Sequence, residues 1–147
     1  MLRDLTKTRL RAVMTAIEVD KGEHLDMGTW CCTSIGARSI HAGLWCEPTW
    51  STAGIPALVD GSPPCGTVLC LAGWAAALFP TEVRQSIQAY ACDILEIPDR
   101  EGVRLFLVDE WPRDLGDAYL DADNDPARCL AVLRQRVERF IETEGRE

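Results

Sequence analysis

The residues best suited to chemistry lie in one run, Cys65-Gly66-Thr67, which stands directly before a long apolar segment. We expect a helix to begin near Thr67, because Pro63-Pro64 break the preceding chain and the residues that follow are apolar on every side. A cysteine just before a helix feels the positive end of the helix dipole and its free N–H groups, which stabilise a thiolate. Such a thiolate is a nucleophile, and the same geometry also binds a small anion.

Three interpretations of this run stay open, namely a catalytic thiol, an anion or ligand contact, and plain packing. A nucleophilic cysteine needs a base, usually a histidine, and the chain holds only His24 and His41, both before Cys65. Packing is the ordinary interpretation, because free cysteine is among the most buried residue types. The residues of the candidate ligand or thiol site are Cys65, Gly66, Thr67, Cys70 and His24.

Zinc is the metal that the cysteines and histidines would suit, because tetrahedral sites of nitrogen and sulfur ligands favour it. The seven cysteines are an odd number, which indicates reduced thiols, and no pair has Cys-x-x-Cys spacing. We therefore predict no metal site and no other cofactor. A zinc site would have to draw on His24, Cys31, Cys32, His41, Cys46, Cys65 and Cys70.

The acidic run from Asp121 to Asp125 begins like a calcium-binding EF-hand loop. The match then fails, because Pro126 stands where the loop needs glycine and Val132 where it needs glutamate. We expect an exposed acidic loop instead, in which Asp125 caps a helix that has Pro126 at its first position.

Apolar periodicity predicts a compact, mainly α fold for a single domain over residues 1–147. Leu10, Val13, Met14 and Ile17 recur at i, i+3, i+4 and i+7, which is one stripe of an amphipathic helix. We expect a bundle of about five helices, at residues 4–19, 67–78, 81–95, 100–109 and 126–143. The second of them is apolar all round and belongs at the centre of the domain.

Residues 23–64, here called the Trp-rich segment, are broken repeatedly by glycine and proline and hold three of the five tryptophans. We expect a long irregular loop folded onto the helices, with a short hairpin for which 29–33 and 55–59 are candidate strands. Tryptophan on a loop either packs beneath it or anchors a partner protein. We place Trp30 in the core, and Trp45 and Trp50 are the candidate partner contacts.

The formal net charge of −8 argues against a nucleic-acid partner, because the surface would repel phosphate. No apolar run reaches the length of about 18 residues that a membrane span needs, and the first residues do not read as a signal peptide. We expect a cytoplasmic protein that binds another protein and is not an enzyme, because no complete catalytic set is present. The alternative is a small enzyme or ligand-binding protein with its site at Cys65. The oligomeric state is not indicated.

The run Cys65-Gly66-Thr67-x-x-Cys70-x-Ala72-Gly73-Trp74 is also distinctive as a motif. With His24 and Trp30 before it, and Leu105-Phe106 and Trp111-Pro112 after it, the chain resembles a group of small uncharacterised proteins of actinobacteria and their phages. The resemblance covers most of the chain except residues 36–62, which look like an insertion. The group has no established activity, so the resemblance implies only a fold and a setting, that of an accessory protein of a phage or mobile element.

Overall fold

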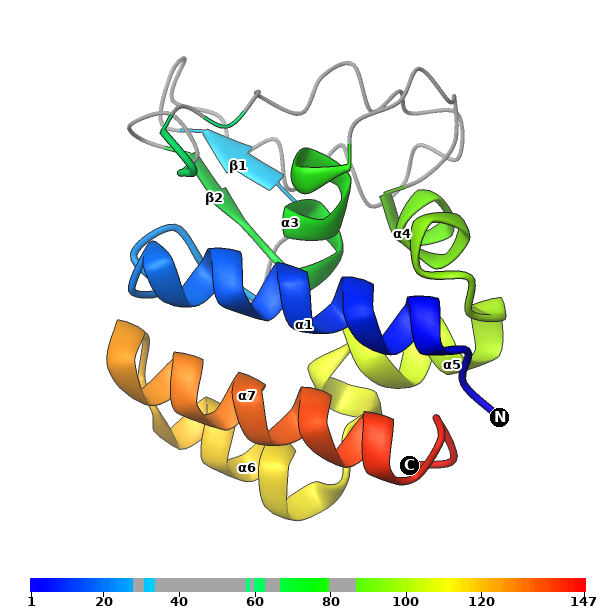
Figure 1. Cartoon of the computed structure of the whole chain (residues 1–147). Coiled ribbons are helices and arrows are strands. Elements are labelled where there is room, and N and C mark those ends of the chain that lie inside the picture. The colour runs from blue at the N-terminus through cyan, green and yellow to red at the C-terminus, as the bar shows by residue number, and fades with distance from the viewer. Residues whose placement is uncertain (28–30, 34–57, 59, 63–66, 80–86) are drawn as a thin grey trace.

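The computed structural model describes residues 1–27, 31–33, 58, 60–62, 67–79 and 87–147, and these residues are mainly helical, as predicted. Figure 1 shows their arrangement, with α1 across the middle, α6 and α7 on one side of it, and the strands with α3 on the other. The elements are α1 (Asp4–Val19), β1 (Cys31–Thr33), β2 (Thr67–Leu69), α3 (Leu71–Leu78), α4 (Ile87–Leu95), α5 (Asp99–Phe106), the 3-10 helix η2 (Val108–Glu110), α6 (Arg113–Asp121) and α7 (Pro126–Glu142).

Helix α1 has the boundaries that its apolar stripe predicts. All four residues of the stripe are buried, and so is Thr6. Two hydrogen bonds close the helix, from the Gly22 N–H to the Ile17 carbonyl and from the Lys21 N–H to the Glu18 carbonyl. Lys21 and Gly22 both have positive φ, so the chain reverses sharply at this end in a Schellman motif.

Helix α3 is the buried centre of the fold, as its apolar composition predicts, and every residue from Leu71 to Ala77 is buried. Its expected start at residue 67 is wrong. The helix begins at Leu71, and the Cys70 sulfur accepts a hydrogen bond from the Gly73 N–H at the N-terminus. Thr67–Leu69 is a strand instead, because β-branched residues such as Thr67 and Val68 favour extended backbone when a partner strand is present.

The two strands form a small antiparallel sheet in which Thr33 pairs with Thr67 and Cys31 pairs with Leu69. The first strand lies within the expected range 29–33. Its partner was not predicted, because residues 67–69 were assigned to the second helix. Of the other candidate strand, residues 55–59, only Leu58 is described, and it lies in no strand.

The C-terminal half differs from the prediction mainly by one extra helix. The expected helix at 126–143 is confirmed as α7, with the Asp125 side chain accepting from the Ala127 N–H. The helix expected at 100–109 is α5 followed by η2, and α4 covers the described part of the range 81–95. Helix α6 was not predicted. It begins directly after Pro112, which is its N-cap, and buries Leu115 and Gly116.

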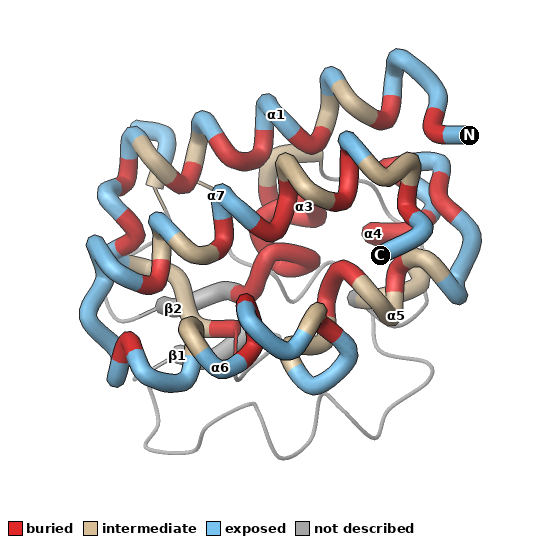
Figure 2. The backbone as a smooth tube through the Cα atoms, turned by 90° about the horizontal axis from the view of Figure 1, so that it is seen from below, coloured by how far each residue is buried: buried red, intermediate tan, exposed pale blue. Residues whose placement is uncertain are grey.

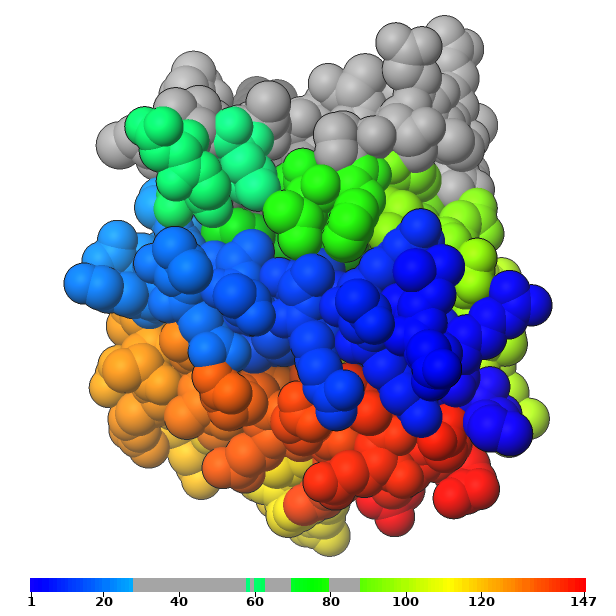
Figure 3. Space-filling view, viewed as in Figure 1, coloured from blue at the N-terminus to red at the C-terminus, as the bar shows by residue number. Residues whose placement is uncertain are grey.

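The helices pack around α3, which contacts both α1 and α4, while α1 also packs against α7, and α7 against α6. Figure 2 shows buried residues recurring along one side of α1, whereas α3 is buried along its length. Figure 3 shows α1 as a continuous band between α3 and the C-terminal helix. The largest fully buried side chains are Trp74, Arg136, Tyr90, Phe106, Phe140, Leu10, Ile17, Leu71, Leu95, Leu105 and Leu133.

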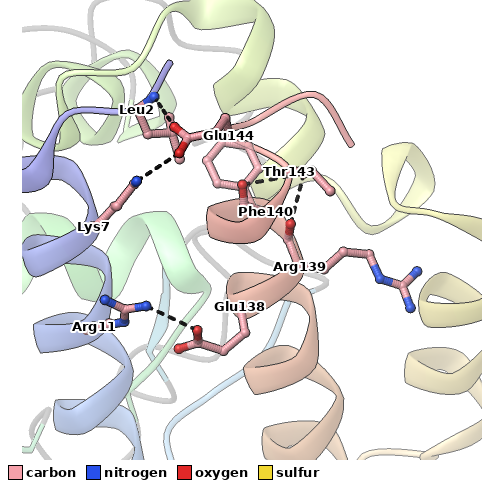
Figure 4. Close-up of polar contacts among 8 residues, drawn as sticks. All are labelled: Leu2, Lys7, Arg11, Glu138, Arg139, Phe140, Thr143 and Glu144. Carbon is pink, nitrogen blue, oxygen red and sulfur yellow. Dashed lines mark hydrogen bonds and ion pairs between the residues drawn. The ribbon is translucent and has the colours of Figure 1, made fainter.

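Polar contacts tie the start of α1 to the end of α7 (Figure 4). The Glu144 carboxylate accepts from the Leu2 N–H at 2.6 Å and from Lys7 Nζ at 2.8 Å. These two donors lower the pKa of Glu144, with the Lys7 bond the larger cause. Farther along, Arg11 of α1 faces Glu138 of α7 at 3.4 Å. The two helices are therefore held together by ion pairs at their rim as well as by their apolar faces.

Candidate functional site

A polar cluster lies at the turn after α1, and Asp20 is at its centre. The carboxylate of Asp20 is buried, with only 1% of its side chain exposed. It accepts the His24 backbone N–H at 2.9 Å and the Ser62 hydroxyl at 2.6 Å, and it lies 2.7 Å from His24 Nδ1. We call Asp20, His24 and Ser62 the Asp20 cluster.

The local backbone fixes the position of His24. The reversal at Lys21 and Gly22 brings the chain back, so that the backbone and the ring of His24 both meet Asp20. The His24 carbonyl accepts from the indole N–H of Trp74, which is fully buried in α3. The peptide N–H of Met27, three residues farther on, donates to the Tyr119 hydroxyl at 3.2 Å. His24 therefore stands on a turn that is anchored at three points.

The tautomer of the imidazole follows from this geometry. A carboxylate is an acceptor only, so the neutral ring must place its proton on Nδ1, facing Asp20. Nε2 then carries the lone pair. No described residue is hydrogen-bonded to Nε2, and 22% of the His24 side chain is exposed. An imidazole oriented in this way can act as a base, a nucleophile or a metal ligand, and it can equally be a structural residue that closes the turn.

The structure describes three of the five residues of the predicted ligand or thiol site. His24 belongs to the Asp20 cluster, Thr67 begins β2, and Cys70 is buried at the start of α3. Cys65 and Gly66 lie outside the described residues. The expected position of Cys65 directly before a helix is wrong, because β2 separates it from α3. The argument from the helix dipole therefore no longer applies to Cys65.

The candidate partner contacts Trp45 and Trp50 lie outside the described residues, as do Trp30, His41 and Cys46. Cys31 and Cys32 are placed only through the backbone of β1. Within the described ranges, no three side chains from His, Cys, Asp and Glu gather as they would around a metal ion. Two further cysteines, Cys92 and Cys129, are buried thiols.

Sequence reasoning missed two members of the cluster, Asp20 and Ser62. A weak signal for Asp20 was present, because an acid four residues before a histidine at a helix end can reach back to the ring. Nothing marked Ser62, which lies 42 residues from Asp20 and meets it only through the tertiary fold. Its hydroxyl is one of many in a segment rich in turn residues.

Comparisons with known proteins found no match for this chain. It matches no protein-family model, no curated protein and no solved structure. In the part of the chain that the structure describes, no helix is long and apolar enough to cross a membrane. A functional interpretation therefore depends on the residues themselves and on where the fold places them.

Proposed function

We propose that this chain is a cytoplasmic accessory protein of phage or mobile-element type that acts by binding another protein through the Trp-rich segment. The observation that carries the proposal is the pairing of β1 with β2. Thr33 and Thr67 are partners in this sheet, so the two residues that flank positions 34–66 lie side by side on the scaffold. Segments presented in this way by a rigid scaffold often carry binding residues.

The anchoring of the segment adds to this support. Ser62 is bonded to Asp20 at the end of α1, and Leu58 packs against the apolar core. The base of the segment is therefore held by the sheet, by a buried hydrogen bond and by apolar packing. Between these anchors the sequence holds Trp45 and Trp50, and tryptophan is enriched at the centres of protein interfaces.

Charge indicates the kind of partner. The loop between α6 and α7 and the end of α6 expose Asp117, Asp121, Asp123 and Asp125. With a net charge of −8, the surface favours a partner whose own surface is basic. Such an interaction weakens as salt rises, because exposed charges are screened within about 10 Å at 0.1 M salt.

The first prediction tests the segment by mutation. Trp45→Ala and Trp50→Ala should each weaken binding to a partner captured from actinobacterial lysate by about 2 kcal/mol or more, as expected for interface anchors. The dissociation constants of the purified pair can be measured by calorimetry at two salt concentrations. The matched control is Leu120→Ala, since Leu120 is 67% exposed but lies on α6. Equal affinity of the tryptophan variants and the parent protein would contradict the proposal.

A second candidate function is thiol chemistry at Cys65, and one observation favours it. Ser62, three residues before Cys65, bonds to the same carboxylate oxygen that lies against the His24 ring. Cys65 therefore follows, three residues along the chain, a side chain that shares the Asp20 carboxylate with His24. An imidazole near a thiol can take its proton and raise the fraction of thiolate.

The second prediction concerns the rates of alkylation. Near neutral pH, iodoacetamide should label Cys65 before the buried thiols Cys70, Cys92 and Cys129. Burial raises the pKa of Cys92 to about 12, with Asp99 adding to the shift, and burial also raises the pKa of Cys129. His24→Gln should slow the labelling of Cys65, which peptide mass spectrometry can follow. Slow labelling of all the cysteines, or a rate that is the same in the variant, would exclude the thiol function.

A further inference from the structure

We propose that His24 is a reactive imidazole site, whose Nε2 atom takes a proton from a neutral O–H or S–H group or attacks an uncharged acyl electrophile. The proposal concerns the ring alone and depends on neither function proposed above. It rests on the geometry of the Asp20 cluster, in which a buried carboxylate lies 2.7 Å from Nδ1.

The position of the proton decides which nitrogen reacts. Asp20 holds the Nδ1 proton, so the lone pair is on Nε2, the atom to which no described residue is bonded. A carboxylate in this position also stabilises the positive charge that the ring gains when Nε2 takes a proton or forms a bond. Because the carboxylate is buried, water screens this interaction little.

The ring is also held rather than free to rotate. The bond from Nδ1 to Asp20 fixes the ring, while the bonds of the His24 peptide N–H to Asp20 and of its carbonyl to the buried Trp74 fix the backbone that carries it. A side chain fixed by its neighbours loses little orientational entropy when it reacts.

The charges near the turn select the class of substrate. Besides Lys21, the charged residues around His24 in sequence are acidic, namely Asp20, Glu23 and Asp26, and Asp60 lies close to Ser62 along the chain. An anionic substrate such as a phosphate ester would be repelled there. An uncharged acyl substrate would not be repelled by these carboxylates. In acyl transfer, Nε2 would attack the carbonyl carbon, the bond to the leaving alcohol or thiol would break, and the leaving group would take up a proton from water.

The third prediction uses diethyl pyrocarbonate, an uncharged acylating reagent that modifies the neutral imidazole. The chain has only two histidines, so His41→Gln leaves His24 as the single histidine. Acylation of this variant, followed by its absorbance near 240 nm, should proceed about tenfold faster than that of an N-acetylhistidine amide. Asp20→Asn should remove most of this advantage, because the amide is neutral.

Two controls separate reactivity from folding. Asp109→Asn makes the same chemical change at an exposed position of η2, outside the Asp20 cluster, so it should keep the fast rate. Circular dichroism shows whether each variant stays folded. Long-range nitrogen–proton NMR should show the remaining proton of His24 on Nδ1. A rate equal to or below that of the free amide, a rate unaffected by Asp20→Asn, or a proton on Nε2 would each overturn the proposal. None of these outcomes bears on partner binding through the Trp-rich segment.

Discussion

Replacement of Gly102 by alanine is expected to destabilise the protein by about 2 kcal/mol, although alanine is the better helix former. In an exposed helix the same change would stabilise by up to about 1 kcal/mol. Gly102 is buried in α5, where a Cβ atom would overlap the sulfur of Cys92 in α4. Cys92 is itself 1% exposed and cannot move aside into water. Gly102→Val should not fold.

The test is a double-mutant cycle followed by urea unfolding. In a Cys92→Ala background the sulfur is gone, so the Cβ of Gly102→Ala has room. The cost of the glycine substitution should then fall by about 2 kcal/mol, a coupling within the range seen for residues in contact. An equal cost in both backgrounds would mean that α4 and α5 do not approach each other as closely at this point as the structure has them.

Gly102 also shows why much of the fold could be predicted while its detail could not. Helices α1, α3 and α7 have strong local signals, namely an apolar stripe, a fully apolar run, and a capping Asp125 followed by Pro126. Such signals can be recognised in a single sequence, because they involve only residues that are close together along the chain. The contact between Gly102 and Cys92 arises only when two helices pack, and no spacing in the sequence reports it.

The helix ends give a second example. Four of the described helices are followed by an acidic or basic residue in the left-handed conformation: Lys21 after α1, Glu96 after α4, Asp123 after α6 and Glu144 after α7. After α1, α4 and α7 the next residue donates its N–H to a carbonyl five residues back, as in a Schellman motif. Glycine is the usual marker of this position, so Glu96 gave no warning. The position of each helix end is therefore determined by the direction in which the tertiary fold requires the chain to continue.

Helix α6 and strand β2 were missed for related reasons. In α6, Gly116 and the aspartates lower the intrinsic helix propensity, and the helix starts after Pro112, a residue type that also often follows a helix end. Gly116 has a tertiary role, because a Cβ there would lie 3.3 Å from the Val108 carbonyl. The local sequence of Thr67–Leu69 is compatible with either a helix or a strand. Pairing with β1, which is distant in sequence, makes these residues extended.

The Asp20 cluster, too, could be predicted only in part from the sequence. His24 was a candidate because of its residue type, which is visible in any sequence. Its partners Asp20 and Ser62 are defined by a turn and by a long-range contact. The sequence therefore indicates which groups could react, while the fold decides which of them are oriented to do so.

Arg136 offers the other large effect, and here we expect a substitution to stabilise the protein. Its side chain is fully buried in α7. Nη2 donates to the carbonyl of Arg104 at 2.7 Å and to the backbone oxygen of Glu147 at 2.9 Å, but Nε and Nη1 have no partner. No carboxylate side chain in the described residues is bonded to it. Of the nearby charges, Arg139 and Arg104 have the same sign, and Glu147 has the opposite sign. Burial of a charge with two unpaired donors is costly.

Arg136→Met should therefore raise the free energy of unfolding by about 1–3 kcal/mol at pH 7, since methionine fills a similar volume without the charge. Arg136→Ala should lower it by about 2–4 kcal/mol instead, because it leaves a cavity beside Phe140. Urea unfolding of the two variants and the parent protein measures whether each substitution raises or lowers the free energy of unfolding. A methionine variant less stable than the parent would show that the two carbonyl bonds and the contact with the Phe140 ring outweigh the cost of burying the guanidinium.

The pH dependence of the same comparison identifies the cause. Burial is the main reason that the pKa of Arg136 falls to about 10, with Arg139 next. A base whose pKa is lower in the folded state binds fewer protons there than in the unfolded chain, so it destabilises the fold while both states are protonated. That penalty is fully present below pH 10 and is relieved as the pH rises through 10. The advantage of Arg136→Met should therefore narrow above pH 10, and an advantage that is constant up to pH 11 would trace it to packing rather than to the buried charge.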